Sequence, residues 1–223
     1  GINSDKLVVI KNGVDRNAFM PTKKNKYLLR KYDLQNKFIV GYIGTHGISQ
    51  NIPFIINCIA EFNNNHQEFN VPVHFLFVGE GAEKEKIKLK SEELNIVNIT
   101  FIDQIKKEEM TDYLSLLDVS IVPLRKSELF LSVIPSKIFE LSAMNIPILL
   151  GVDGEARALV EQYGNGIFYK PDDDESFLRQ LNSLISNNTK SLDPYKDGGN
   201  NLAMDHDRQK LALRLLSIIK QLL

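Results

Sequence analysis

Six short apolar runs, each followed by a longer segment of helical period, constrain the fold of this chain more than any other feature. The runs are rich in Val, Ile, Leu and Phe and nearly continuous, which is typical of strands covered by helices on both faces. Strands that alternate with helices indicate a parallel sheet with right-handed crossovers. The predicted strands are Phe38–Ile43, Val73–Val78, Ile99–Ile102, Val119–Val122, Ile146–Leu150 and Ile167–Tyr169.

The segments between and after these runs predict helices. Together they favour an α/β fold, a Rossmann-like doubly wound parallel sheet in three α/β/α layers. Ligands of such sheets bind at the carboxyl ends of the strands, where loops lead into helix N-termini, so functional residues are expected there. The predicted helices are Ile52–Asn65, Glu83–Leu94, Lys107–Leu117, Ser136–Met144, Glu155–Tyr163 and Asp174–Ser186.

The composition excludes several classes of protein. The chain has 223 residues, of which 43% are hydrophobic and 25% charged, enough for one globular domain without disulfides or a structural metal. Its 27 Lys and Arg against 28 Asp and Glu give a net charge of -1, which disfavours nucleic acid as a partner. Residues 211–223, the longest apolar segment, contain Arg214 and Lys220 and fall short of the roughly 20 residues of a membrane span. The single Cys58 favours a reducing compartment.

Both ends of the chain are expected to add to the sheet domain. Leu7–Ile10 predicts a short strand, and residues 187–201, rich in Asn, Ser, Asp and Gly, have the composition of a linker. A last helix is predicted over residues 207–223. Packing against protein is favoured over membrane-surface binding for its apolar stripe, because it has few basic residues. The stripe consists of Leu211, Leu215, Ile218 and Leu222.

Two glycine-containing segments follow predicted strands. In Gly44-Thr45-His46-Gly47 the glycines let backbone amides approach an anion, although a tight strand-to-helix turn is the alternative. His46 in this loop fits a structural role as well as a catalytic one. The segment Gly79-Glu80-Gly81 begins like a dinucleotide fingerprint but has Lys84 in place of the third glycine. A turn that serves sheet packing is therefore favoured over a nicotinamide site.

Two further strand ends carry polar groups. The peptide groups around Gln104 and Ile105 could donate and accept hydrogen bonds at the edge of a nucleobase, although in isolation the segment is only a loop. Arg125 follows the next strand, and its planar guanidinium could bind a phosphate. An exposed ion pair with Glu128 is the alternative for Arg125.

Ser136, Lys137 and Glu140 carry the most informative local pattern. Ser136 predicts a helix N-cap, next to N–H groups that could bind phosphate. The helix dipole disfavours a cation at Lys137, so an anionic ligand is a reason for its presence. The Glu140 carboxylate, three residues later, could accept hydrogen bonds from two ribose hydroxyls. The alternative is an exposed Lys–Glu pair that contributes only about a few tenths of a kcal/mol.

In their order along the chain these segments resemble the C-terminal half of a retaining family 4 (group 1) glycosyltransferase of GT-B architecture. Residues 9–15, with Phe19 and Pro21, are similar to the NGVD…F.P motif of the family, and residues 77–81 to its VGxG turn. Residues 135–147 resemble the PSKxFExxAxxxP version found in L-fucosamine-type transferases. The GE…GxG…P run is matched by residues 153–155, residues 164–166 and Pro171.

The resemblance implies a nucleotide-activated sugar as substrate, a UDP- or GDP-sugar, with no cofactor and no metal. It assigns Glu140 to the ribose and the backbone of Gln104 and Ile105 to the base. The diphosphate would lie against the Gly44–Gly47 loop and the helix start at Ser136 and Lys137. Arg125 and Lys137 are candidates for stabilising the charge that develops on the leaving diphosphate. No catalytic residue is assigned.

Two positions depart from the pattern of the family. Ser132 stands where the family has the first Glu of its E-x7-E motif, which contacts the donor sugar. Thr45 and Asn51 stand where many members have Arg and Lys after the first glycine loop. We therefore expect Arg125 and Lys137 to take over the diphosphate.

These inferences predict a donor-binding domain over residues 1–223, in which residues 206–223 cross back to an N-terminal acceptor domain absent from the chain. The acceptor would be a glycan or a lipid-linked sugar, and the chain alone would transfer little. The resemblance also implies a cytoplasmic location with peripheral association at the inner membrane face, for polysaccharide assembly.

Two alternatives remain open at this point. The first is a nucleotide-sugar epimerase or hydrolase that uses His46 and Glu155 as acid and base. The second is a non-catalytic module that binds nucleotide sugar or docks on a partner through its last helix.

Overall fold

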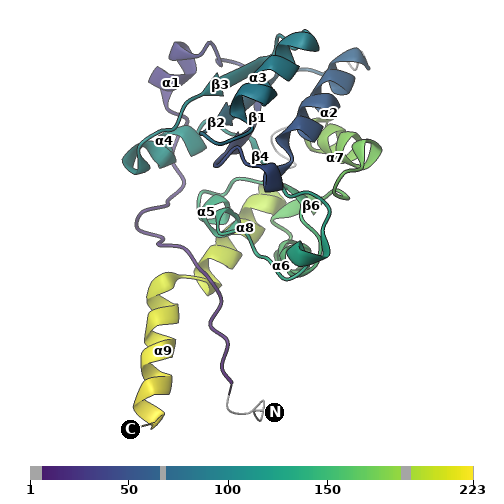
Figure 1. Ribbon diagram of the computed structural model, residues 1–223. Coiled ribbons are helices and arrows are strands. Elements are labelled where there is room, and N and C mark those ends of the chain that lie inside the picture. The colour runs from purple at the N-terminus through teal and green to yellow at the C-terminus, as the bar shows by residue number, and fades with distance from the viewer. Residues whose placement is uncertain (1–6, 66–68, 187–191, 223) are drawn as a thin grey trace.

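A six-stranded parallel sheet forms the centre of the domain (Figure 1). The computed structural model describes residues 7–65, 69–186 and 192–222. The strand order is β3-β2-β1-β4-β5-β6, so the direction of winding reverses beside β1, and the Rossmann-like α/β prediction is confirmed. The strands are β1 (Phe38–Ile43), β2 (Val73–Val78), β3 (Ile99–Ile102), β4 (Val119–Pro123), β5 (Ile148–Gly151) and β6 (Gly166–Phe168).

The apolar character of the strands follows from their place in the sheet. Every residue of β1, β2, β4 and β5 is buried, as continuous apolar runs predict for strands with helices on both faces. Strands β1 to β3 have the predicted bounds, whereas the bounds of β4, β5 and β6 differ from the prediction by one or two residues. β1 lies between β2 and β4, with Ile43 opposite Val78 and Gly41 opposite Ser120.

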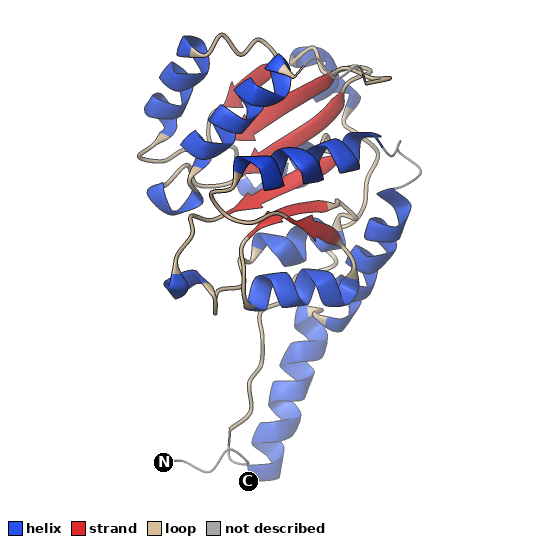
Figure 2. Ribbon diagram, turned by 90° about the vertical axis from the view of Figure 1, so that its right-hand side faces the viewer, coloured by secondary structure: helices blue, strands red, loops and turns tan. Residues whose placement is uncertain are grey.

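Helices cover both faces of the sheet (Figure 2). One apolar cluster joins α2, α3 and α7 to one face, and a second joins α1, α4, α5, α6 and α8 to the other. The helices are α1 (Lys26–Lys31), α2 (Ile52–Asn64), α3 (Lys84–Glu93), α4 (Met110–Leu114), α5 (Lys137–Ala143), α6 (Glu155–Tyr163), α7 (Asp174–Ser186), α8 (Asp193–Asp205) and α9 (Arg208–Leu222). Short 3-10 turns are η2 (Ile48–Gln50), η3 (Lys107–Glu109) and η4 (Glu128–Phe130).

The helix predicted over residues 107–117 is divided and shorter, since η3 precedes α4 and the helix ends at Leu114. Helix α1 was not predicted, although Asn25 before it is a typical cap. Its side chain accepts hydrogen bonds from the N–H groups of Tyr27 and Leu28.

The linker predicted over residues 187–201 is wrong for its described part, which belongs to α8. Gly198 and Gly199 are buried in this helix. A Cβ at Gly198 would lie only 2.2 Å from the carbonyl oxygen of Tyr163, and one at Gly199 would lie 3.0 Å from that of Ser142. The glycines let α8 approach α5 and α6 closely, so a composition typical of a linker serves helix packing. Residues 187–191 of the predicted linker lie outside the described residues.

The strand predicted at Leu7–Ile10 is also wrong. This segment pairs with no strand of the described chain, and Leu7, Val8 and Val9 are exposed. The first pairing comes later, where the Val14 N–H donates to the carbonyl of His206 at 3.0 Å. An apolar run of this length can form a strand only where a sheet edge is available to it.

Helix α9 begins one residue later than predicted and extends away from the sheet, in the same direction as the N-terminal segment (Figures 1 and 2). Its apolar stripe packs only in part against the described chain, so the predicted packing against protein stays a prediction. Leu211 and Ile218 are half-buried and Leu215 is 47% exposed. The side chain of Leu222 lies outside the described residues.

Candidate functional site

Two adjoining cavities open at the carboxyl end of β1, where the winding of the sheet reverses. Each has a volume of about 240 Å³, and they share Ile43, Gly44, Thr45 and Met110. We call them the loop cavity and the helix cavity. The loop cavity is completed by Val78, Gly79, Glu80, Gln104 and Ile105. The helix cavity is completed by Tyr42, Gln50, Leu114, Ser120, Ser136, Lys137, Glu140 and Leu141.

The wall shared by the cavities is fixed by contacts between backbones. The Gly44 N–H donates to the carbonyl of Val78 at 2.9 Å, and the His46 N–H donates to that of Glu80 at 2.8 Å. A Cβ at Gly79, whose φ is +142°, would lie 2.0 Å from the carbonyl oxygen of Gly44. The loops after β1 and β2 therefore fit together only because glycine stands at this contact.

His46 belongs to this loop but lines neither cavity. Its side chain is completely buried, with its ring centroid 5.8 Å from that of Tyr42 and 6.5 Å from that of Phe77. Neither ring nitrogen has a hydrogen-bond partner among the described residues. Burial, together with the charge of Lys84, lowers the pKa of His46 to about 4, so the imidazole is neutral at physiological pH.

Lys137, on the first turn of α5, places an ammonium group in the helix cavity. Its Nζ donates to the carbonyl of Ile43 at 3.2 Å and lies 3.9 Å from the ring centroid of Tyr42. Within residues 7–65, 69–186 and 192–222 no carboxylate lies within ion-pair distance of it. Burial lowers the pKa of Lys137 to about 8, against a smaller opposite effect of Glu140. A half-buried cation without a carboxylate partner is suited to an anionic ligand.

Glu140 lines the same cavity one helical turn further along α5. It is half-buried, and its carboxylate makes no hydrogen bond in the described part of the chain. Burial raises its pKa, whereas the charges of Lys137 and Arg208 oppose that shift. Ser136, exposed beside them, caps no N–H group with its side chain, so its hydroxyl also remains available to a ligand. The expected combination of hydroxyl, cation and carboxylate is thus present in one cavity.

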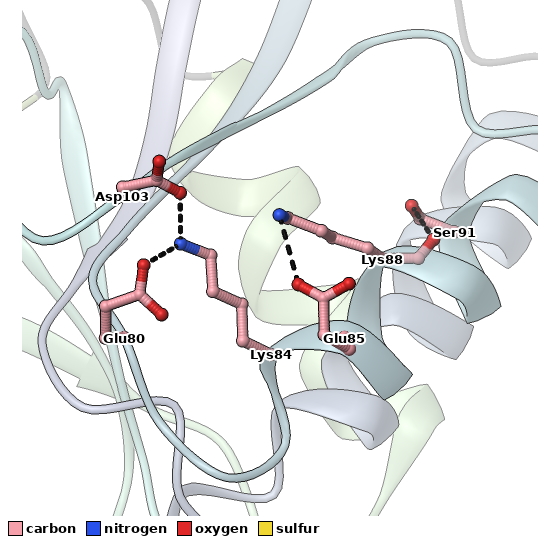
Figure 3. A network of polar contacts seen from close by, with 6 residues as sticks. All are labelled: Glu80, Lys84, Glu85, Lys88, Ser91 and Asp103. Atoms are coloured by element: carbon pink, nitrogen blue, oxygen red, sulfur yellow. Dashed lines mark hydrogen bonds and ion pairs between the residues drawn. The ribbon is translucent and has the colours of Figure 1, made fainter.

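Gln104 and Ile105 border the loop cavity just after β3. Their backbone N–H and C=O groups make no hydrogen bond to the rest of the described chain. Peptide groups of this kind can pair with the edge of a planar heterocycle. The preceding Asp103 is tied to Lys84, which also holds Glu80 (Figure 3).

Besides His46, three of the predicted residues lie apart from the two cavities. Arg125 is exposed and lines a separate cavity of about 270 Å³ near the ends of β4, β5 and β6. Ser132 is exposed and lines none of these cavities. Gly47 is half-buried beside the side chain of Gln50. Arg125 and Lys137 therefore do not share a cavity, although the sequence suggested that they act together.

The alternative pair of acid and base is not brought together either. His46 is buried inside the loop, and Glu155 is exposed at the start of α6 and lines neither the loop cavity nor the helix cavity.

Tyr42, Gln50 and Met110 line the helix cavity and were not predicted from the sequence. Gln50 ends η2, a short turn that carries little signal, and Met110 is the first residue of the short helix α4. Tyr42 could have been found, because it is the polar aromatic residue in the otherwise apolar run of β1, two residues before the glycine loop.

Two features are absent from the described residues. No three His, Cys, Asp or Glu side chains gather there into a possible metal site. No helix in these residues combines the length and the apolar character that crossing a membrane requires.

The fold and the cavities define a doubly wound α/β domain with a crevice at its switch point, the place where ligands of such sheets bind. Residues 26–201 match the family model of glycosyl transferases group 1, and the chain belongs to this family. No curated protein matches the chain significantly.

Several solved structures share the fold. The chain aligns with HepE from Anabaena, crystallised with UDP and glucose, at a TM-score of 0.78 and 17% identity. A glycosyltransferase from Rickettsia africae gives a TM-score of 0.78 at 19% identity. Each alignment covers 99% of this chain and 58% of the other, so this chain spans a little over half the length of these relatives. The C-terminal domain of LpcC from Francisella tularensis aligns over 97% of its length and 86% of this chain, with a TM-score of 0.67 and 18% identity.

Proposed function

We propose that this domain binds a nucleotide diphosphate sugar and supplies the donor half of a glycosyltransferase site. Family membership and the UDP complex of HepE support a nucleotide sugar as the ligand. One observation carries the proposal, namely that Lys137 and Glu140 line the same cavity and that neither forms an ion pair with the described residues. A nucleotide diphosphate offers an anion, which the ammonium group would bind, and a pair of vicinal hydroxyls, which the carboxylate would bind.

In the proposed complex the base occupies the loop cavity, against the peptide groups of Gln104 and Ile105. The ribose lies next to Glu140, whose carboxylate accepts from the two hydroxyls. The diphosphate lies against the Gly44-Thr45 backbone and Lys137. Negative charge grows on the diphosphate as the glycosidic bond to it breaks, so a fixed cation there lowers the barrier. Lys137 takes this role, and Arg125 contributes only if its exposed side chain turns toward the site.

We also propose that the sugar passes to a glycan or lipid-linked acceptor with retention of configuration. HepE and the Rickettsia protein are longer than the region they share with this chain, which supports an acceptor-binding domain outside it. The chain alone is then expected to bind donor without ordinary turnover, because nothing positions an acceptor. An L-fucosamine-type sugar and a peripheral place at the inner membrane face belong to the same proposal and rest on the motifs in residues 135–147 and on family analogy.

Titration calorimetry with UDP, GDP and ADP tests the proposal. We expect one of them to bind the chain, and Lys137→Met to weaken that binding by about tenfold or more, as for a charge-assisted contact. Lys126→Met is the matched control, because Lys126 is an exposed lysine on the loop after β4 and lines neither the loop nor the helix cavity. Absence of binding for all three nucleotides, or equal losses in the two variants, would refute the proposed site.

A further inference from the structure

The loop after β3 is held in place by very few polar contacts. The last backbone hydrogen bond at the end of β3 is the 3.0 Å bond from the Gly79 N–H to the carbonyl of Ile102, and the backbone groups of Asp103, Gln104 and Ile105 make none to the rest of the described chain. Beyond that point the Asp103 side chain, bound to Lys84, makes the one polar link from these three residues to the rest of the described chain. The polar restraint on the peptide groups beside the loop cavity therefore comes from a single side chain, that of Asp103, while the Ile105 side chain packs against the apolar core.

Lys84 is unusual for its burial and its place. Its side chain is only 4% exposed, whereas those of its partners Glu80 and Asp103 are 47% and 81% exposed. It is the first residue of α3, where the helix dipole disfavours a cation. Burial alone would lower the pKa of Lys84, but the two carboxylates outweigh it and the pKa is raised. Two carboxylates compensate for an otherwise unfavourable charge, which indicates a role for all three groups as a unit.

The unit joins three parts of the structure (Figure 3). Glu80 belongs to the loop after β2 and lines the loop cavity. Its carbonyl accepts from the His46 N–H, and the Glu83 N–H donates to the carbonyl of His46 at 2.9 Å. The start of α3 is thus fixed to the loop after β1, and Lys84 extends this fixed frame to the loop after β3.

We infer that Lys84 is a positioning residue for base recognition: through Asp103 it holds the peptide groups of Gln104 and Ile105 at the edge of the loop cavity. The inference rests on the proposed function, because it assumes that a base occupies this cavity. Lys84 itself does not line the cavity and acts only through its partners.

The experiment compares Lys84→Met with Lys84→Arg and with Lys88→Met. Lys88 lies one turn further along α3 and pairs with Glu85 at 3.3 Å, so its variant removes a cation and an ion pair from the same helix (Figure 3). Two readouts are measured on the full chain. One is the affinity for UDP and, separately, for inorganic pyrophosphate, which lacks a base. The other is the backbone amide chemical shifts of residues 103–105.

In Lys84→Met we expect UDP to bind about tenfold more weakly, with pyrophosphate affinity unchanged, and the amide signals of residues 103–105 to move. Lys84→Arg should recover most of the UDP affinity, and Lys88→Met should resemble the parent chain. Equal losses for UDP and pyrophosphate in Lys84→Met, or unchanged UDP affinity, would overturn the inference. If the parent chain binds no nucleotide, the proposed function fails. The amide signals then test separately whether Lys84 holds the loop, and unmoved signals of residues 103–105 in Lys84→Met would reject that role.

Discussion

Replacing Lys137 by methionine should stabilise the fold while weakening ligand binding. Burial lowers the pKa of Lys137 from 10.5 to about 8. Each pH unit corresponds to about 1.4 kcal/mol, so the protonated side chain destabilises the folded state by up to about 3 kcal/mol. Methionine removes that cost but also loses the contact of the cation with the Tyr42 ring, which contributes about 1 kcal/mol. We therefore expect the free energy of unfolding to rise by about 1–2 kcal/mol at neutral pH.

The lowered pKa of Lys137 also determines how the stability difference between the parent protein and Lys137→Met changes with pH. Below about pH 8 Lys137 is protonated in the folded and the unfolded chain, and the full cost is present. Between about pH 8 and 10.5 the folded chain loses this proton while the unfolded chain keeps it, so the parent protein gains stability relative to Lys137→Met as pH rises. The stability difference between the two proteins should shrink over this range.

Urea unfolding followed by circular dichroism, near pH 7 and again near pH 9.5, measures that difference. Taking the difference between the two proteins cancels the titration of groups that both contain. Lys126→Met, at an exposed lysine, should leave the free energy of unfolding within about 0.5 kcal/mol of the parent value. A less stable Lys137→Met variant at neutral pH, or a stability difference that does not change with pH, would refute the reasoning.

Three further predictions concern the ribose contact and the close backbone packing. Glu140→Gln should weaken UDP binding by about tenfold but leave the affinity for a 2′,3′-dideoxy analogue nearly unchanged in calorimetry, and equal losses would argue against a ribose contact. Gly79→Ala should lower the free energy of unfolding by about 3 kcal/mol, because its Cβ would lie 2.0 Å from the Gly44 carbonyl at a φ of +142°. Gly198→Ala should lower the free energy of unfolding by about 2 kcal/mol or more, because its Cβ would collide with a backbone carbonyl of α6. Gly164→Ala is the control: no atom lies within 4 Å of its Cβ, so it should cost only about 1 kcal/mol, for its φ of +64°. Urea unfolding of both variants measures these losses, and a larger loss of unfolding free energy in Gly164→Ala than in Gly198→Ala would contradict the packing argument.

The sheet could be predicted because its signal is local. Each strand is a nearly continuous apolar run, and burial between two helix layers favours that pattern along a strand. The prediction of a linker in place of α8 was wrong for the opposite reason, because the signal for this helix is not local. Its Asn, Asp and Gly content disfavours an isolated helix, and its stability comes from close contacts of Gly198 and Gly199 with residues far away in the sequence.

The candidate site was predicted in part for a similar reason. Lys137 and Glu140 lie on one helix, so their spacing alone predicts that they are neighbours. The grouping of Arg125 with them depends on how a loop is arranged after β4, and that arrangement directs it to another cavity. The inward orientation of the His46 ring depends on aromatic neighbours in β1 and β2, which the loop sequence does not reveal. The break in the glycine fingerprint at Lys84 was visible in the sequence, but its carboxylate partner Asp103 only becomes visible in three dimensions.

The wall that separates the loop cavity from the helix cavity has a consequence for the design of inhibitors. Because both cavities border Gly44 and Thr45, a small heterocycle in the loop cavity and an anionic group in the helix cavity would lie next to each other. Two weak fragments found separately could be joined by a short tether, and the gain from effective concentration can reach about 100-fold or more when the tether fits the span. The proposed donor site would therefore offer a route to nucleotide mimics that need contain neither a ribose nor a phosphate.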